Sequence, residues 1–252
     1  MDEKPESLVE IETEIAAKLN FAAHQSSFSV LRSLRVLNLS PTERLEEVVL
    51  RLQADPPFFK ERVWQIDRIE PDGSLMVRDR ELSLDGGLLL NLSESVSGTA
   101  KFTVEKDETV LFEIVKPVEL LAYNEWGGAA YMPELLASFV TPNDPAVDRL
   151  LHGASKVLRQ AGRPDAIDGY RSGKRERVWE IAASVYSAIS GLGLSYVNPP
   201  ASFEKNGQKI RLPGQILEGG VATCLDTSVL FAAAFEQAGL NPVIVTTKGH
   251  AF

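Results

Sequence analysis

Apolar and polar residues alternate along the first part of the chain, up to about residue 122. In residues 7–16, for example, the apolar residues Leu8, Val9, Ile11 and Ile15 alternate with three glutamates. A period of two residues is typical of strands with one face in a core. The same alternation predicts strands at residues 7–16, 29–38, 48–54, 63–69, 74–80, 98–105 and 109–120.

Turn sequences separate these segments. Pro71-Asp72-Gly73 and Asp85-Gly86-Gly87 both favour tight turns. Short strands at regular spacing, with no long helix between them, are typical of an antiparallel sandwich of the immunoglobulin type. We therefore predict such a sandwich over residues 1–122. Residues 45–51 (LEEVVLR) could also form a helix, and this alternative stays open.

After residue 122 the apolar residues recur every three or four positions, as they do in helices. Helices are expected at residues 132–140, 143–159 and 174–190. Asn143 is expected to cap the second helix, with Pro145 in its first turn. The pattern predicts a second, mainly helical domain over residues 123–252. The expected fold class is therefore α+β.

Composition narrows the classes of function. The chain has 252 residues, of which 44% are hydrophobic, which is enough for two ordinary globular domains. Its 26 basic and 35 acidic residues give a net charge of −9, which argues against a nucleic-acid groove. The basic run at residues 171–177 (RSGKRER) is interpreted as a solvated loop and helix start, not as a phosphate site.

The chain also lacks the signals of export and membrane insertion. No apolar run approaches the roughly 20 residues that a membrane helix needs, and the N-terminal sequence MDEKPES has no apolar signal core. A single cysteine excludes an internal disulfide and suits a reducing compartment. We expect a soluble cytoplasmic protein with no cofactor, no bound metal and no membrane partner.

The single cysteine, Cys224, stands at the start of an apolar helical segment. Thr223 and Asp226 have the spacing of a capping box, which predicts that the helix begins at Cys224. In the first turn, free backbone N–H groups and the helix dipole favour the thiolate. Cys224 is therefore a candidate nucleophile. The alternative is a small buried core residue, which is the commoner role of a lone cysteine in an apolar segment.

His250 is the candidate base. A helix from Cys224 to Ala238 would be about 21 Å long. The β-branched run at residues 243–247 is expected to continue as one strand, which would cover about 26 Å between Pro242 and His250. A strand that runs back beside the helix would therefore bring His250 level with Cys224.

Other polar residues have structural explanations. His24 is expected in a polar loop and His152 at the edge of an apolar helix stripe, and neither has a metal-binding partner nearby in the sequence. Asp226 is explained by capping and points about 200° away from Cys224 around the helix. Gln208 and Gln215 are upstream candidates for binding an oxyanion, but we leave them out of the predicted site.

The segments GVATCLD (220–226), AGLNPV (238–243) and GHAF (249–252) form a wider pattern. A glycine precedes the cysteine, a helix follows, an alanine-glycine-aliphatic-x-proline turn leads into a strand, and histidine, alanine and an aromatic residue come next. This pattern resembles the transglutaminase-like superfamily of papain-fold enzymes.

The region from Val115 onward also resembles the N-terminal part of large bacterial helicase-related proteins. That resemblance rests on VELLAYNEWGG (118–128), FVTPNDPAVDRLL (139–151), YVNPPASFEKNGQKIRLP (196–213) and the cysteine segment.

The first resemblance implies that Cys224 attacks an amide carbonyl of a protein or peptide, with His250 as the base that pairs with it. The Cys224 N–H would be one oxyanion donor. The family's third site residue lies on a strand after the histidine. We therefore expect a domain that is incomplete at its C-terminus and inactive as it stands. The sequence has no phosphate loop of the G-x-x-x-x-G-K-[ST] type, so a helicase motor is not expected in it.

Two functions compete at this point. The first is a transglutaminase-like thiol hydrolase domain behind an immunoglobulin-like module, with a protein or peptide substrate. The second is a non-catalytic interaction segment, in which the sandwich and an inactive papain-like unit form a docking platform of a larger protein. The reactivity of the Cys224 thiol in the folded protein separates the two.

Overall fold

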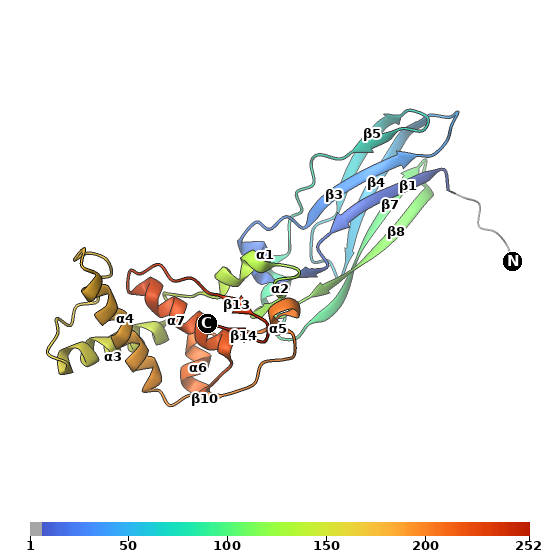
Figure 1. The fold of residues 1–252 in the computed structure, drawn as a ribbon. Helices are drawn as coiled ribbons and strands as arrows, with labels where there is room; N and C mark the ends of the chain where they lie inside the picture. The colour runs from blue at the N-terminus through green and yellow to red at the C-terminus, as the bar shows by residue number, and fades with distance from the viewer. Residues whose placement is uncertain (1–6) are drawn as a thin grey trace. The chain divides into compact units, whose positions relative to one another are not determined.

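The computed structural model describes residues 7–252, which divide into two compact units. The first unit ends at Tyr123 and the second runs from Asn124 to Phe252 (Figure 1). The expected absence of a signal core concerns the N-terminal segment, which lies outside the described residues apart from Ser7. Strands dominate the first unit and helices the second, so the structure is of the mixed α+β class.

The first unit contains two sheets. One has the order β1-β3-β6 and is antiparallel; its strands are β1 (Val9–Ile15), β3 (Leu31–Asn38) and β6 (Ser74–Met76). The other has the order β2-β8-β7-β4-β5; its strands are β2 (Lys18–Leu19), β8 (Thr109–Leu120), β7 (Val96–Lys106), β4 (Leu45–Asp55) and β5 (Arg62–Ile69). In this second sheet β2 runs parallel to β8, and the other pairs are antiparallel.

Alternating burial explains why these residues form strands. In β4, Val48, Leu50 and Leu52 are fully buried, while the residues between them are partly accessible. In β3, Leu34 and Val36 are buried in the same alternating way. The helical alternative for residues 45–51 is therefore wrong. Burial of every second residue gives a strand one buried face, whereas in a helix the buried residues would lie on all sides.

Two short helices in the first unit were not predicted. They are α1 (Phe21–Gln25), capped by the Asn20 side chain, and α2 (Gly86–Leu90), capped by Asp85. His24 thus lies in a helix and not in a loop. One helical turn is too short to show a period of 3.6 residues, which is why the sequence pattern did not reveal either helix.

The second unit consists of helices connected by two-residue strands. The helices are η1 (Pro133–Phe139, a 3₁₀ helix), α3 (Pro145–Gln160), α4 (Arg175–Ser190), α5 (Phe203–Asn206), α6 (Pro213–Gly219) and α7 (Cys224–Gln237). The strands are β9 (Glu125–Trp126), β10 (Ser195–Tyr196), β11 (Gln208–Lys209), β12 (Val221–Ala222), β13 (Thr246–Thr247) and β14 (His250–Ala251). The three helices expected from the apolar period are present, although the first is a 3₁₀ helix. The predicted cap of α3 is wrong: Asp144, not Asn143, accepts the Ala146 N–H at 2.8 Å.

The core of the second unit joins α3, α4, α6 and α7. Its buried residues are Val147, Leu150, Ala154, Val185, Ile189, Ile216, Ala222, Leu230, Ala233 and Ala234. α3 and α4 lie side by side, and both contact α7 (Figure 1). Most of α7 is buried, as its apolar sequence predicts, so the surrounding core fixes the position of this helix.

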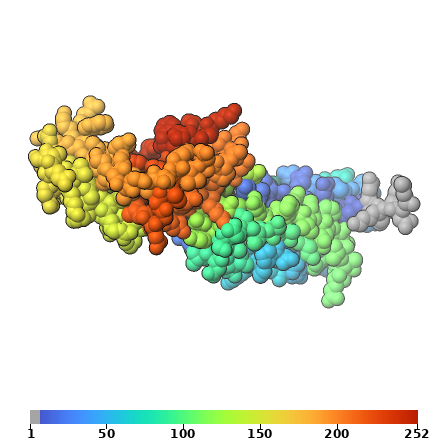
Figure 2. Space-filling model, turned by 90° about the horizontal axis from the view of Figure 1, so that it is seen from below, coloured from blue at the N-terminus to red at the C-terminus, as the bar shows by residue number. Residues whose placement is uncertain are grey.

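The end of the chain differs from the single strand that we expected. β13 and β14 form a tight hairpin, in which Thr247 pairs with His250 and Val245 exchanges two backbone hydrogen bonds with Phe252. Gly249, with φ of 73°, allows the chain to reverse between the strands. In the space-filling view, the end of the chain (dark red) lies at the surface of the second unit (Figure 2). Within residues 7–252, no helix is both long and apolar enough to cross a membrane.

Candidate functional site

Cys224 is the first residue of α7, as the capping box predicts. The Thr223 hydroxyl accepts the Asp226 N–H at 3.2 Å, and the Asp226 carboxylate accepts the Thr223 N–H at 2.9 Å. These reciprocal bonds define where the helix begins. In the described part of the chain, no group accepts a hydrogen bond from the Cys224 N–H. This N–H is therefore available to an incoming oxyanion.

Asp226 has a structural role, in agreement with the sequence-based interpretation. Its side chain is completely buried. Besides the Thr223 N–H, it accepts the Arg211 backbone N–H at 2.8 Å and a guanidinium N–H of Arg211 at 2.9 Å. With its oxygens engaged in this way, Asp226 is not a third member of a catalytic triad. It anchors the start of α7 to the segment that leads into α6.

Cys224 and His250 both line one groove of the second unit, with a volume of about 540 Å³. β14 packs against α7, and this contact brings the two residues to the same groove. The other lining residues are mostly apolar: Tyr186, Tyr196, Thr227, Ser228, Phe231, Ala232, Phe235, Pro242, Val243, Ile244, Ala251 and Phe252. Cys224 is only 5% exposed, so the groove is its route to solvent.

The histidine stands at the exposed rim of this groove. Its ring lies beside Phe252, with the ring centroids 6.1 Å apart. No hydrogen bond between the imidazole and the Cys224 thiol is present among the described residues. Because His250 follows the hairpin turn and is exposed, its ring can change rotamer without disturbing the core.

The side chain that interacts with the thiol is Tyr196, which the sequence analysis missed. It lines the groove together with Cys224. The pKa of the Tyr196 phenol is raised above its ordinary value, first by desolvation and then by its interaction with Cys224. Tyr196 comes from β10, which pairs with the strand just before α7. Two-residue strands carry no periodicity, so no pattern in the sequence pointed to this neighbour.

The two glutamines are engaged elsewhere and do not line the groove. Gln208 is buried and donates its side-chain N–H to the Thr223 hydroxyl at 2.9 Å. Gln215 accepts the Leu212 N–H at 2.9 Å and completes the cap of α6. Leaving both out of the predicted site agrees with this placement.

The remaining histidines are not grouped with metal-binding residues. His24 packs beside Phe21, with ring centroids 5.8 Å apart, and against Gly86, where an added Cβ would lie 2.5 Å from the His24 ring. His152 is exposed on α3. Among residues 7–252 there is no cluster of three or more histidine, cysteine or acidic side chains that could hold a metal ion.

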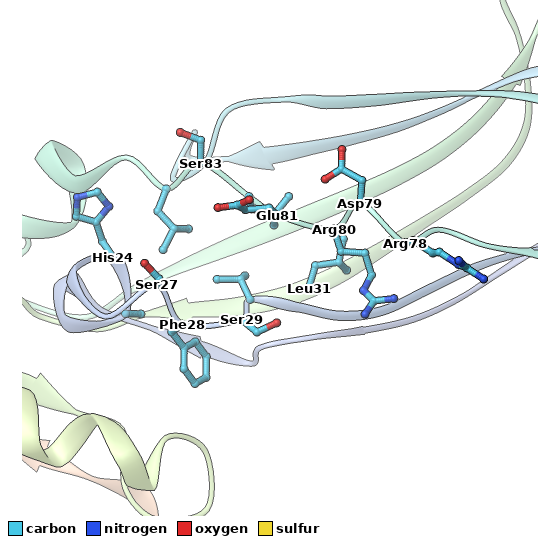
Figure 3. Close-up of a pocket in the computed structure, with 14 residues that line it drawn as sticks. His24, Ser27, Phe28, Ser29, Leu31, Arg78, Asp79, Arg80, Glu81 and Ser83 are labelled. Atoms are coloured by element: carbon cyan, nitrogen blue, oxygen red, sulfur yellow. The ribbon is translucent and has the colours of Figure 1, made fainter.

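The first unit has a cavity of its own, of about 510 Å³ (Figure 3). It lies between residues 23–31 and residues 78–84, and its polar lining includes His24, Arg78, Asp79, Arg80 and Glu81. The charges are mixed, and Asp79 is already paired with Arg62 at 2.6 Å. The lining includes His24 and serines but no cysteine, so we place the candidate thiol chemistry in the groove of the second unit.

The basic run at residues 171–177 includes one residue with a clear structural role. Arg177 is buried and forms ion pairs with Asp168 at 3.5 Å and Glu180 at 3.0 Å. It also donates hydrogen bonds to the carbonyl groups of Pro164 and Ala166. Arg177 therefore holds the loop before α4. The segment is a loop and helix start, as predicted, but the prediction that it is solvated is wrong for Arg177.

Comparison with known proteins adds no family assignment to this geometry. The chain matches no protein-family model and no curated protein.

Proposed function

We propose that the second unit is a transglutaminase-like thiol hydrolase that acts on amide bonds of a protein or peptide, with Cys224 as nucleophile and His250 as base. The observation that carries this proposal is the position of Cys224. It lies in the first turn of α7, on the wall of the groove that also holds His250. The resemblance to the papain-fold pattern around both residues supports the same assignment.

The arrangement supports a two-stage reaction. The Cys224 thiolate forms a bond to the amide carbon, and the Cys224 N–H donates to the resulting oxyanion. When the intermediate collapses, the C–N bond breaks and the protonated His250 gives its proton to the leaving amine. Water then attacks the thioester and His250 takes a proton from that water. When the C–S bond breaks, the carboxylic acid leaves and the Cys224 thiolate is restored beside the protonated His250.

We also propose an immunoglobulin-like sandwich for the first unit and a papain-like fold for the second, as part of a helicase-related protein. The strand orders β1-β3-β6 and β2-β8-β7-β4-β5 support the sandwich, since each of the two sheets joins some strands that are not consecutive in the chain. The helix α7, with its cysteine at the first turn and a strand pair bearing the histidine after it, supports the papain-like unit.

Alkylation of the native protein by iodoacetamide tests the nucleophile. The chain has one cysteine, so all alkylation reports on Cys224. At about pH 7 we expect Cys224 to react roughly ten times faster than free cysteine, because the helix N-terminus favours the thiolate. The rate is measured by mass spectrometry. Alkylation that occurs only after denaturation would reject the enzyme and favour the non-catalytic docking segment.

Replacement of His250 tests the base. In His250→Ala we expect the residual hydrolysis of an activated ester, which a cysteine–histidine pair can catalyse without the third site residue, to fall roughly 100-fold, because proton transfer by a positioned side chain is lost. The substitution should leave the fold intact, since His250 is exposed. His152→Ala, which removes an exposed histidine from α3, is the matched control and should retain full activity. Equal rates in the two variants would contradict the assignment of His250.

A further inference from the structure

Tyr196 is brought to the cysteine by a defined strand pairing. β10 runs parallel to β12, with Ser195 opposite Val221 and Tyr196 opposite Ala222. Two backbone bonds hold this register: Ser195 N–H donates to Gly220 and Val197 N–H donates to Ala222, both at 2.9 Å. Since β12 ends two residues before Cys224, the register places Tyr196 beside the first turn of α7.

The side chain of Tyr196 reaches into the same groove as the thiol. Tyr196 lines the groove with Cys224 and His250, and 61% of the residue remains exposed. Desolvation and then the interaction with Cys224 raise the pKa of its phenol, which indicates that the hydroxyl and the sulfur are neighbours. The second tyrosine of the groove, Tyr186, is equally exposed at 63%, but it stacks on Phe231 at 5.8 Å and has no hydrogen bond with Cys224 in the described structure.

We propose that Tyr196 is a positioning residue of the thiol site, whose hydroxyl donates a hydrogen bond to the Cys224 sulfur and holds the thiolate in the groove, ready for attack. This inference rests on the proposed function, because it gives the hydroxyl a role only if Cys224 acts as a nucleophile. A phenol is suited to this role, since its O–H remains protonated at neutral pH and can donate to a thiolate.

The hydrogen bond has two opposite effects on reactivity. It stabilises the thiolate, so a larger fraction of Cys224 is ionised at a given pH. It also lowers the intrinsic nucleophilicity of that thiolate, because nucleophilicity falls with basicity. Removing the hydroxyl should therefore slow alkylation at low pH and accelerate it slightly at high pH. A loss of packing alone would not produce such a crossing of the two pH profiles.

The test measures the iodoacetamide rate from about pH 5 to about pH 10 for the native protein, Tyr196→Phe and Tyr131→Phe. In Tyr196→Phe we expect the pH of half-maximal rate to rise by about half to one unit; with the higher plateau included, rates below it should be roughly 1.5 to five times lower. The plateau should rise about twofold. Tyr131→Phe removes a hydroxyl from a tyrosine of the second unit that does not line the groove, and it should follow the native profile.

The outcomes separate this inference from the proposed function. A reactive native protein whose profile is unchanged in Tyr196→Phe, or reduced equally at every pH, overturns the role of Tyr196 alone. A native protein that reacts no faster than free cysteine overturns the proposed function.

The contact itself is checked without any variant of Tyr196. Phenolate absorbance is titrated in the native protein and in Cys224→Ala, where the pKa of Tyr196 should move down toward its ordinary value. An unchanged phenol titration contradicts the contact, even if Tyr196→Phe does not fold.

Discussion

Replacing Asp226 with alanine is expected to lower the free energy of unfolding of the second unit by about 3 to 4 kcal/mol. Asp226 is fully buried and accepts hydrogen bonds from the backbones of Thr223 and Arg211 and from the Arg211 guanidinium. Alanine leaves the two backbone N–H groups without acceptors. The guanidinium loses less, because the Arg211 side chain is 37% exposed and regains water.

The same substitution should also remove the enhanced reactivity of Cys224. Asp226 and Thr223 together define the first turn of α7, in which the cysteine lies. When the cap is lost, the first turn frays, and the thiol no longer lies at an ordered helix N-terminus. We therefore expect the alkylation rate at about pH 7 to fall to that of free cysteine.

Two further variants make this prediction specific. Asp226→Asn keeps the shape and one acceptor oxygen, and should be intermediate in stability. Asp165→Ala breaks the exposed ion pair with Arg159 and should leave stability nearly unchanged. Urea unfolding is followed by far-ultraviolet circular dichroism, since all helices of eight or more residues within 7–252 lie in the second unit. If Asp226→Ala were as stable as Asp165→Ala, the buried network would not anchor α7.

The start of α7 could be predicted from sequence because its signals are local. Thr223 and Asp226 are three residues apart, so the capping box is visible without any knowledge of the fold. Gly239, with φ of 78°, follows the helix in the same local way. The partner of Asp226 was not predictable, because Arg211 precedes it by 15 residues in an irregular segment. Such a pairing depends on how α6 packs against the rest of the unit.

The end of the chain shows the opposite case. The β-branched run at residues 243–247 favours extended backbone, and the sequence-based expectation continued it to His250 as one strand. Extended backbone is compatible with a strand and with one arm of a hairpin. The reversal at Lys248 and Gly249 therefore remained hidden, although a glycine there was a usable turn signal. His250 nevertheless lines the groove with Cys224, since the hairpin packs on α7.

Replacing Gly207 with alanine should be more disruptive still, with a loss of about 4 kcal/mol or more in the stability of the second unit. Gly207 has φ of 91°, a conformation that only glycine adopts readily. A Cβ there would also collide with the backbone carbonyl of Trp126, which is itself buried. Backbone atoms of β9 cannot yield as a flexible side chain could, so strain and collision add.

The damage from Gly207→Ala should extend to the cysteine through the residue that follows. Gln208 pairs with Trp126 in the β9–β11 ladder and donates to the Thr223 hydroxyl, the cap of α7. Displacing β11 therefore weakens the cap next to Cys224. Gly162→Ala is the matched control: its φ is 67°, but a Cβ there meets nothing within 4 Å, so it should cost only about 1 to 2 kcal/mol.

Thermal unfolding compares the two variants, and hydrogen exchange of residues 203–210 and 221–228 locates the damage. Equal losses would show that the backbone conformation alone, and not the contact with Trp126, requires glycine at position 207. A selective loss in Gly207→Ala, with faster exchange at both segments, would instead connect the β9–β11 contact to the start of α7.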